Sequence, residues 1–307
     1  MFGTKKLLPF ALLFLLASSY SLLFSVNKIA VQEGLPNIAY VFWHSLGGAL
    51  LLLPVAMWRG APPQFSWEHG RTYLVWGLLS TAAPISLLTY AAPHLSAGLV
   101  TMILVLVPLI TYALALAFRM ERFRVLSVLG LLFGLGGILL VVVPKASLPE
   151  PGMAAWVLLT LLAPLCFGLV TVFAGKFRPP ASPSVTLACG LLFGSAILLV
   201  PVMVGTGQFY IFPGPSLLGD LCILFASILT ALVFALFLEI IRLAGPVFVS
   251  QHNFAAVLIG FGWGALFFGE QPRPLIWGAT ALMFFGLVLH TYSVRRGTAS
   301  AAAPDFA

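Results

Sequence analysis

Four consecutive polar residues, Ser250-Gln251-His252-Asn253, form the densest group of hydrogen-bonding side chains in an otherwise apolar sequence. Their hydroxyl, amide and imidazole groups can bind a polar solute or a neighbouring helix. Four successive polar residues surround a helix, so they cannot all face lipid without a penalty. Two interpretations are open for Gln251 and His252: they line a cavity, or they hydrogen-bond another helix.

Glu239 lies in the preceding apolar segment, at a depth similar to that of the polar cluster. A carboxylate inside a membrane segment is costly and is expected to have a partner. The partner is either His252 across the helices or Arg242 one turn further along the same helix. Pairing with His252 would give Glu239 a coupling role and would leave transport with a single proton possible.

Other candidates for a substrate site are hydroxyl, imidazole and aromatic side chains scattered through the apolar segments. A lone hydroxyl commonly bonds a carbonyl of its own helix, and a lone His or Trp commonly serves packing. Trp263 lies mid-segment between two glycines and away from the interface belts, so substrate stacking or gating stays open beside packing. The predicted substrate-binding set is Tyr20, Ser21, Trp43, His44, Trp76, Ser80, Tyr90, Thr101, Tyr112, Gln251, His252 and Trp263.

Prolines recur in the apolar segments, and three of them, Pro84, Pro108 and Pro164, are predicted to take part in gating. Proline removes a backbone hydrogen bond and kinks a helix. Kinked helices can converge at one end and splay at the other. Proline is also tolerated in membrane helices generally.

Composition indicates an integral membrane protein. Of 307 residues, 61% are hydrophobic and 7% are charged, and a soluble domain needs more charge than this on its surface. Runs of about 20 apolar residues match the thickness of a bilayer core. Ten spans are predicted, at residues 7–29, 38–58, 73–92, 95–118, 125–143, 153–174, 185–204, 217–242, 246–268 and 275–293.

The distribution of Lys and Arg predicts the orientation. With cytoplasmic termini, 12 basic residues lie inside and three, Lys28, Lys145 and Arg273, lie outside, as the positive-inside rule requires. The net charge of +7 is therefore assigned to membrane orientation, and no nucleic-acid partner is expected. The first apolar run is interpreted as a retained span and not as a signal peptide.

A weak internal repeat divides the chain. Shifted by 149 residues, the stretch 95–142 aligns with 244–291, so that Phe118 aligns with Phe267 and Gly137 with Gly286. Five spans per half require the second half to be inverted, which places a substrate site near the midplane. We expect repeats at 1–147 and 148–296 and a disordered tail at 297–307. The shift also pairs Thr101 with Ser250 and Tyr90 with Glu239.

This pattern resembles the EamA branch of the drug/metabolite transporter superfamily. The resemblance rests on ten short spans in two inverted halves, on Gly269-Glu270 after the ninth span, and on Tyr20-Ser21 ahead of Lys28. Phe167-Gly168 ahead of Lys176 repeats the last motif, and Met120-Glu121 replaces Gly-Glu in the first half. The resemblance implies an all-α fold in which the fifth and tenth spans form a scaffold and the other eight surround a central cavity.

The fifth span agrees with a scaffold role. Gly130 and Gly134 form a small-xxx-small pair, which lets two helices approach closely. We therefore expect packing, and not substrate binding, at these glycines.

The sequence predicts a secondary transporter that works by alternating access. No Lys or Arg lies near the middle of a span, which argues against a sugar or nucleotide-sugar carrier because phosphates need fixed positive charge. A neutral or zwitterionic solute fits better. The resemblance to bacterial ten-helix amino-acid exporters implies export of amphipathic amino acids, aromatic ones included, across the bacterial inner membrane.

Other classes of function find less support. The sequence has no HExxH, no GxSxG and no paired mid-span Asp, so we predict no catalytic residue, no metal site, no cofactor and no enzyme activity. A receptor would not need hydroxyl and aromatic groups repeated in both halves. The expected partners are a small-molecule substrate and the lipid bilayer, and the chain is expected to be a monomer or a homodimer.

Overall fold

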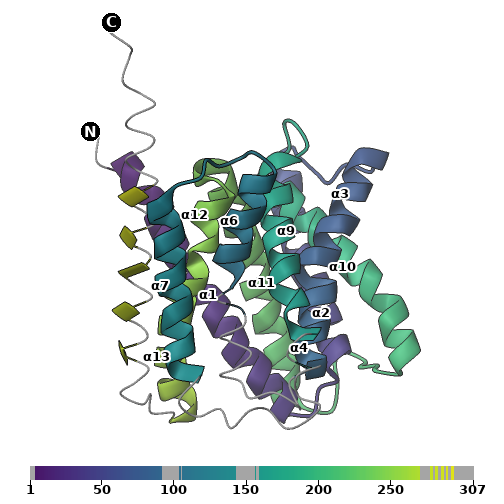
Figure 1. Ribbon diagram of the computed structural model, residues 1–307. Helices are drawn as coiled ribbons and strands as arrows, with labels where there is room; N and C mark the ends of the chain where they lie inside the picture. Colours follow the sequence, from purple (N-terminus) through teal and green to yellow (C-terminus); the bar gives the residue numbers. More distant parts are fainter. Residues whose placement is uncertain are drawn as a thin grey trace, which may run out of the picture.

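The computed structural model describes residues 4–91, 106–142 and 159–269, together with isolated residues between 104 and 293 (Figure 1). The regular secondary structure of this part is helical. Its elements are α1 (Thr4–Gln32), α2 (Asn37–Trp58), α3 (Trp67–Gly77), the π-helical segment η1 (Leu78–Ala82), α4 (Ala83–Ala91), α6 (Val107–Ala117), α7 (Val125–Val142), α9 (Leu162–Lys176), α10 (Ser184–Thr206), α11 (Leu217–Ala244), α12 (Pro246–Ser250) and α13 (His252–Phe268).

Four helices in the described ranges are long and apolar enough to cross a membrane: Leu8–Gln32, Asn37–Trp58, Ser184–Thr206 and Leu217–Ala244. The large side chains on their outer faces remain exposed, as Phe14, Ile197 and Ile228 illustrate. In a bilayer such a surface is in contact with hydrocarbon, and each helix satisfies its own backbone hydrogen bonds.

The predicted third and ninth spans differ from simple helices. The third begins at Trp67, six residues before the predicted start, and changes to π-helix between α3 and α4. The ninth is divided at Gln251 into α12 and α13. The predicted tenth span, residues 275–293, falls largely outside the described residues.

Capping residues and glycines define several helix ends. Ser66 caps α3 by accepting a hydrogen bond from the His69 N–H, and Ser216 caps α11 by accepting from the Gly219 N–H. α10 and α13 both stop at a glycine with positive φ, Gly207 at 66° and Gly269 at 63°. Glycine adopts this conformation without steric cost.

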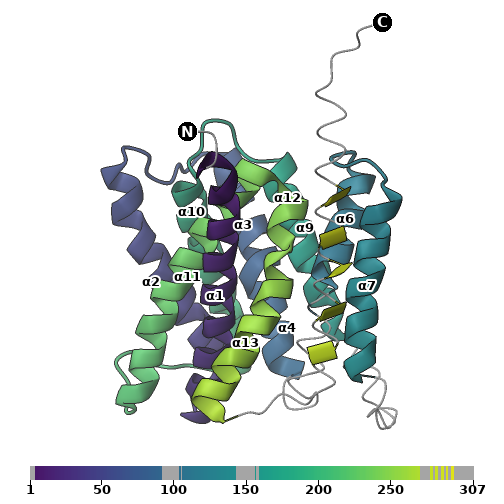
Figure 2. The ribbon, with the colours of Figure 1, turned by 90° about the vertical axis from the view of Figure 1, so that its left-hand side faces the viewer.

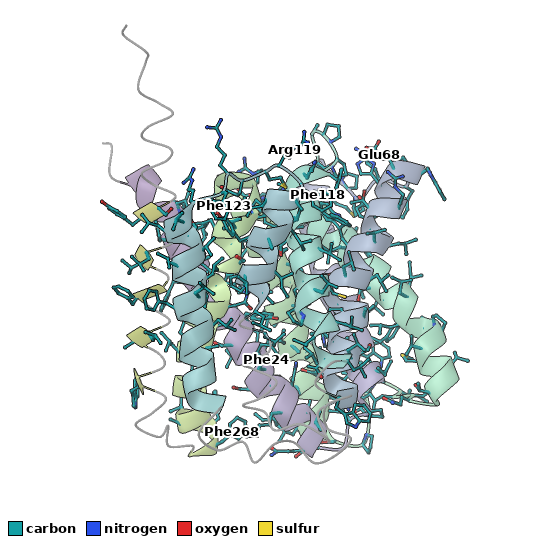
Figure 3. The ribbon with its side chains drawn as sticks, viewed as in Figure 1. Phe24, Glu68, Phe118, Arg119, Phe123 and Phe268 are labelled. Atoms are coloured by element: carbon teal, nitrogen blue, oxygen red, sulfur yellow. The ribbon has the colours of Figure 1, made fainter. Side chains whose placement is uncertain are left out.

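The two halves run in opposite directions (Figures 1 and 2). In Figure 1, α1 descends from the end where Arg119 is labelled in Figure 3, whereas its repeat counterpart α9 ascends to that end. α2 opposes α10, the α3–η1–α4 segment opposes α11, and α6 opposes α12–α13. The structure therefore has the arrangement of an inverted repeat.

Helices of one half pack on helices of the other. α2 crosses α11 at Gly48, where an added Cβ would lie 3.3 Å from the Ala231 nitrogen. The symmetry-related pair, α3 and α10, meets at Gly77 and Gly194, and a Cβ on Gly77 would lie 2.6 Å from the Leu191 carbonyl oxygen. α1 packs on α11 and α13, and α9 packs on α4 and α6. The apolar core thus lies between the halves.

The prediction that glycines of the fifth span serve packing is confirmed. A Cβ on Gly286, in the predicted tenth span, would collide with the Gly130 carbonyl oxygen and would lie 3.0 Å from the Gly134 nitrogen. Gly134 also faces the Phe254 ring of α13. α7 stands at the edge of the bundle (Figure 2).

Candidate functional site

A small cavity lies in the middle of the bundle. The space open to water molecules inside it is about 60 Å³, which is enough for a few waters. Its walls come from α1, α2, η1, α4, α6, α9, α11, α12 and α13 and therefore from both halves. The lining residues are Leu16, Tyr20, Leu23, Asn27, His44, Ser80, Thr81, Ile85, Val107, Phe167, Val170, Thr171, Thr230, Val233, Phe234, Phe237, Ser250, His252 and Asn253.

Two irregular segments face this cavity. The first is η1, which carries Ser80 and Thr81, and π-helical turns are frequent at functional sites. Pro84 lies two residues after η1 and cannot donate the backbone hydrogen bond that an α-helix would need at that point. The second is the junction of α12 and α13 at Gln251. Non-helical backbone inside a membrane protein is tolerated where it is buried or lines a cavity.

The polar cluster satisfies the carbonyls at this junction. The Ser250 hydroxyl donates to the Val247 carbonyl at 2.8 Å, His252 Nδ1 bonds the Val249 carbonyl at 2.7 Å, and the Asn253 amide donates to the Ser250 carbonyl at 3.0 Å. Each of the three side chains bonds the backbone carbonyl of the residue three positions earlier in the chain. They stabilise the helix break by hydrogen-bonding its carbonyls, and all three also line the cavity.

Two pairs of lining residues are related by the 149-residue shift. Thr81 corresponds to Thr230, and Ile85 corresponds to Phe234. Each pair comes from the third helical segment of its half, so the cavity has a hydroxyl and an apolar side chain at equivalent places on both sides. This pseudosymmetry is expected when inverted halves meet around one site.

A second set of polar side chains, from α1, α2 and α11, forms hydrogen bonds at the cavity. The Thr230 hydroxyl lies 3.1 Å from His44 Nδ1, and the Tyr40 hydroxyl donates to Asn27 Oδ1 at 2.8 Å. The Tyr40 and His44 rings meet edge to face, with centroids 5.1 Å apart. His44 Nε2 is buried and has no hydrogen-bond partner among the described residues. Such an atom is costly to bury unless a solute or water satisfies it.

Aromatic rings form another wall. The Tyr20 ring from α1 meets the His252 ring at 5.1 Å, and Phe237 from α11 meets it at 6.4 Å. Both contacts are edge to face, a favourable geometry for aromatic pairs. Among the described residues, no Lys, Arg, Asp or Glu lines the cavity. The site offers hydroxyl, amide, imidazole and aromatic groups without fixed charge.

The structure brings some of the residues singled out from the sequence together. Tyr20, His44, Ser80 and His252 all line this central cavity. Thr101 lies outside the described residues. Only the backbone of Tyr90, in α4, is described. The proposed pairings of Thr101 with Ser250 and of Tyr90 with Glu239 therefore stay predictions.

Other predicted substrate residues lie away from the cavity lining. Ser21 donates to the Ser18 carbonyl at 3.1 Å. Trp43 Nε1 donates to the Tyr210 carbonyl at 2.8 Å and so holds the loop between α10 and α11. Trp76 of α3 is buried in the apolar core that α3 shares with α2, α10 and α11. The Tyr112 hydroxyl bonds the Arg122 carbonyl and the Arg124 N–H and so orders the loop after α6.

Gln251 and Trp263 are also absent from the lining. The Gln251 side chain is buried and its amide atoms have no partner among the described residues. The Trp263 ring stacks on Phe267 with centroids 5.7 Å apart and planes at 24°. Pro108 and Pro164 lie in the first turns of α6 and α9. The residues four positions earlier, Leu104 and Thr160, are themselves helical, and each proline lacks the N–H that would bond their carbonyls. The chain turns at Leu106 and Leu161, directly before α6 and α9, and the gating role of both prolines stays a prediction.

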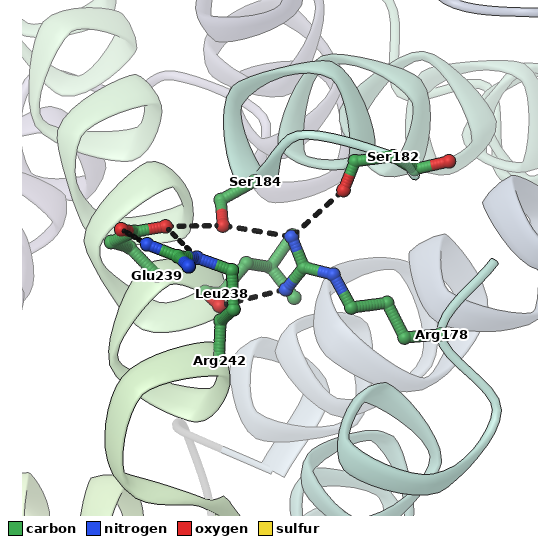
Figure 4. Close-up of polar contacts among 6 residues, drawn as sticks. All are labelled: Arg178, Ser182, Ser184, Leu238, Glu239 and Arg242. Carbon is green, nitrogen blue, oxygen red and sulfur yellow. Dashed lines mark hydrogen bonds and ion pairs between the residues drawn. The ribbon is translucent and has the colours of Figure 1, made fainter. Parts of the chain in front are cut away.

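Glu239 is held by Arg242 and Ser184, and not by His252 (Figure 4). Arg242 Nε donates to the carboxylate at 3.0 Å, and Ser184 donates at 2.6 Å. Arg178 extends the group by donating to the Leu238 carbonyl at 3.1 Å. Of the two partners that the sequence left open, the structure therefore shows Arg242, one turn further along the same helix.

The Arg178 group forms a structural clamp at the end of the bundle. Arg178 also donates to the Ser182 carbonyl at 3.0 Å and the Ser184 hydroxyl at 2.9 Å. Burial lowers the pKa of the Arg178 guanidinium, and the Glu239 carboxylate opposes this shift. Ser182 Oγ lies 3.2 Å from His69 Nε2, so the loop after α9 joins α3 to α11.

Several lining residues escape sequence reasoning. Thr81, Thr171 and Thr230 are ordinary threonines in apolar helices, and Phe234 and Phe237 resemble lipid-facing side chains. One signal could have found two of them: the 149-residue shift aligns Thr81 with Thr230. Asn27 lies near the end of α1, where a polar residue at the membrane interface is common.

The combination of inverted helical halves, apolar spans and a polar central cavity defines a multi-pass membrane transporter. The model of the EamA-like transporter family matches residues 7–143 and 154–292, once per half. The chain belongs to the EamA-like transporter family, within the drug/metabolite transporter superfamily.

Similarity to individual proteins is lower. Two WAT1-related proteins of Arabidopsis thaliana are each 24% identical, one over 148 residues and the other over 306 residues. The first match covers 46% of this chain and 41% of its relative, and the second covers 87% and 81%. A solved crystal structure superposes with a TM-score of 0.74 at 17% identity, over 96% of this chain and 98% of that chain. This likeness supports the fold.

Proposed function

We propose that this protein is a secondary transporter that exports small amphipathic metabolites, with amino acids, aromatic ones included, as the main cargo. The observation that carries the proposal is the uncharged central cavity, in which hydroxyl, amide and imidazole groups stand beside Tyr20 and Phe237. Such a site suits a solute that combines an apolar body with a neutral or zwitterionic polar end.

The architecture proposed for transport has ten helices in two inverted five-helix repeats, at residues 1–147 and 148–296. Tight crossings of α2 on α11 and of α3 on α10 join the halves. Rocking of one half against the other around these crossings would expose the cavity to alternate sides. The small volume of the cavity requires its walls to move apart before an amino acid can enter.

The proposed location is the bacterial inner membrane, with both termini in the cytoplasm. Support comes from the basic end of the bundle, where Arg119 is labelled in Figure 3 and where Lys176 donates to the Phe118 carbonyl at 2.8 Å. Basic loops remain on the cytoplasmic side of a membrane. Accessibility of single cysteines placed at Arg119 and Gly207 to a membrane-impermeant reagent would test this orientation.

A sugar or nucleotide-sugar carrier is the alternative within the superfamily. Such a carrier needs cationic side chains against phosphate, and none is found among the described lining residues. Purified protein in proteoliposomes preloaded with labelled L-phenylalanine, L-threonine or a nucleotide sugar would separate the two. We expect release of the amino acids. Release of the nucleotide sugar alone would overturn the proposal.

A matched pair of variants connects transport with the cavity. Thr230→Val removes a cavity hydroxyl, whereas Thr206→Val removes a hydroxyl that donates to the Val202 carbonyl at the exposed end of α10. We expect only Thr230→Val to weaken amino-acid transport. Equal transport by both variants would argue against the cavity as the transport site.

A further inference from the structure

The α12–α13 junction presents an unusual set of atoms to the cavity. Ser250, His252 and Asn253 all line the cavity, and all three also bond backbone carbonyls. A carbonyl oxygen can only accept a hydrogen bond. Each of the three side chains must therefore act as the donor in its backbone bond.

Because these donor atoms bond the backbone, the side-chain atoms that are left to bind a solute can be named. The Ser250 hydroxyl hydrogen points to the Val247 carbonyl, so its oxygen keeps only lone pairs. The Val249 carbonyl fixes the proton of neutral His252 on Nδ1, so Nε2 is an acceptor. The Asn253 amide nitrogen faces the Ser250 carbonyl, so Oδ1 is the oxygen left over. The three neighbouring residues thus keep three acceptor atoms, and the second N–H of the Asn253 amide is their one remaining donor.

We propose that this acceptor wall, formed by Ser250, His252 and Asn253, binds the amino group of the cargo. An ammonium group has three N–H donors and no acceptor, and so does the charged form of any primary amine. A carboxylate or phosphate has only acceptors, so it would face three acceptor atoms in the same wall and find a single N–H donor there, on Asn253. The inference rests on the proposed function and specifies which end of the cargo the second half of the chain recognises.

The charge of the site limits the cargo further. No carboxylate lines the described cavity, so the ammonium must bring its own counter-charge or be bound by neutral dipoles. A zwitterionic amino acid meets this requirement, since its carboxylate stays with the ammonium. The edge-to-face rings of Tyr20 and Phe237 beside His252 supply an apolar surface next to the acceptor wall.

The test measures binding of three ligands that share a phenyl ring, with purified protein in detergent and titration calorimetry. L-Phenylalanine has an amino and a carboxylate group, phenethylamine has only the amino group, and 3-phenylpropionate has only the carboxylate. We expect 3-phenylpropionate to bind on the order of tenfold more weakly than either amine, because hydrogen bonds to a charged group are strong.

Two serine variants distinguish recognition from general damage to the fold. Ser250→Ala removes one acceptor of the wall, whereas Ser227→Ala removes a buried hydroxyl that makes the same kind of backbone bond, to Ile223 at 2.8 Å, away from the cavity. The readout is the ratio of affinities for phenethylamine and 3-phenylpropionate, which a purely structural role would not change. Ser250→Ala is expected to reduce this ratio several-fold, and Ser227→Ala is expected to leave it unchanged.

The outcomes separate this inference from the proposed function. A preference for phenethylamine that depends on Ser250, with no amino-acid transport in proteoliposomes, supports the acceptor wall and overturns the transport proposal. Equal or tighter binding of 3-phenylpropionate overturns the acceptor wall, even if amino acids are transported. Binding of none of the three ligands, or an unchanged ratio in Ser250→Ala, overturns it as well.

Discussion

The third helical segments of the two halves are related by the repeat but differ in shape. In the first half the chain passes through α3, η1 and α4, and the π-helical turn brings Ser80 and Thr81 to the cavity. In the second half α11 is one helix of 28 residues, and it contributes Thr230, Val233, Phe234 and Phe237. The two segments therefore run in opposite directions and share one hydroxyl position, that of Thr81 and Thr230, while their local geometry has diverged.

This difference shows how a duplicated scaffold can build an asymmetric site. Helix order and packing partners are preserved, since α2 packs on α11 as its counterpart α10 packs on α3. The cavity surface is free to differ: the acceptor wall lies at the break after Ser250 in the second half, and the π-helical hydroxyls lie in the first. An asymmetric cavity can bind the two ends of an asymmetric solute differently.

The largest effect is expected where the third segment of the first half packs on α10. Gly194→Leu would drive a side chain into the Tyr73 carbonyl of α3, and overpacking costs several kcal/mol when backbone must move. We expect loss of folded, monodisperse protein in size-exclusion chromatography. Gly70→Ala is the control, since nothing lies within 4 Å of an added Cβ there. Normal folding of Gly194→Leu would contradict the close crossing.

A smaller effect is expected at the clamp that holds the end of α11. Arg178→Gln removes donors to the Leu238 and Ser182 carbonyls and to Ser184, which should cost about 1.5–3 kcal/mol because the donor is charged. Arg242→Gln removes an ion pair whose Arg242 side chain is 52% exposed, and such pairs contribute about 0–1 kcal/mol. Thermal unfolding in detergent should show the larger decrease in Tm for Arg178→Gln. The reverse order would argue that α11 is held mainly by its own ion pair.

The paired threonines test whether the two third segments are equivalent in function. Thr230 lies 3.1 Å from His44 Nδ1, whereas Thr81 lies 3.3 Å from the hydroxyl of its neighbour Ser80. Thr230→Val leaves the buried imidazole without this partner, so it should lower transport about five- to tenfold. Thr81→Val should lower transport less, because Ser80 still supplies a hydroxyl. Initial rates in proteoliposomes give the comparison, and equal losses would indicate a symmetric site.

The smallest effect is expected at the loop that precedes α11. Trp43→Phe keeps the ring that faces Phe212 but removes the 2.8 Å hydrogen bond from Nε1 to the Tyr210 carbonyl. One such bond contributes about 0.5–1.5 kcal/mol, so Tm should decrease slightly and amino-acid affinity should be unchanged. A change in amino-acid affinity with unchanged Tm would instead indicate that Trp43 binds the substrate.

The amino-acid sequence was enough to predict a membrane transporter, the pairing of its halves and much of the helix order. Hydropathy alone predicts spans, because a bilayer requires about 20 apolar residues per crossing, and α2, α10 and α11 lie close to the predicted limits. The repeat and the odd number of spans per half predicted the inversion that Figures 1 and 2 show.

Which polar residues share a cavity depends on how the helices pack and could not be predicted from the sequence. Tyr20 and Ser21 are neighbours in sequence, but successive residues of a helix point about 100° apart, and only Tyr20 lines the cavity. Trp43 and His44 separate in the same way, toward a loop and toward the site. The sequence singled out Ser250 to Asn253 by composition alone. Their role as an acceptor wall depends on where the helix breaks and which carbonyls it frees, and that is set by packing between helices far apart in the chain.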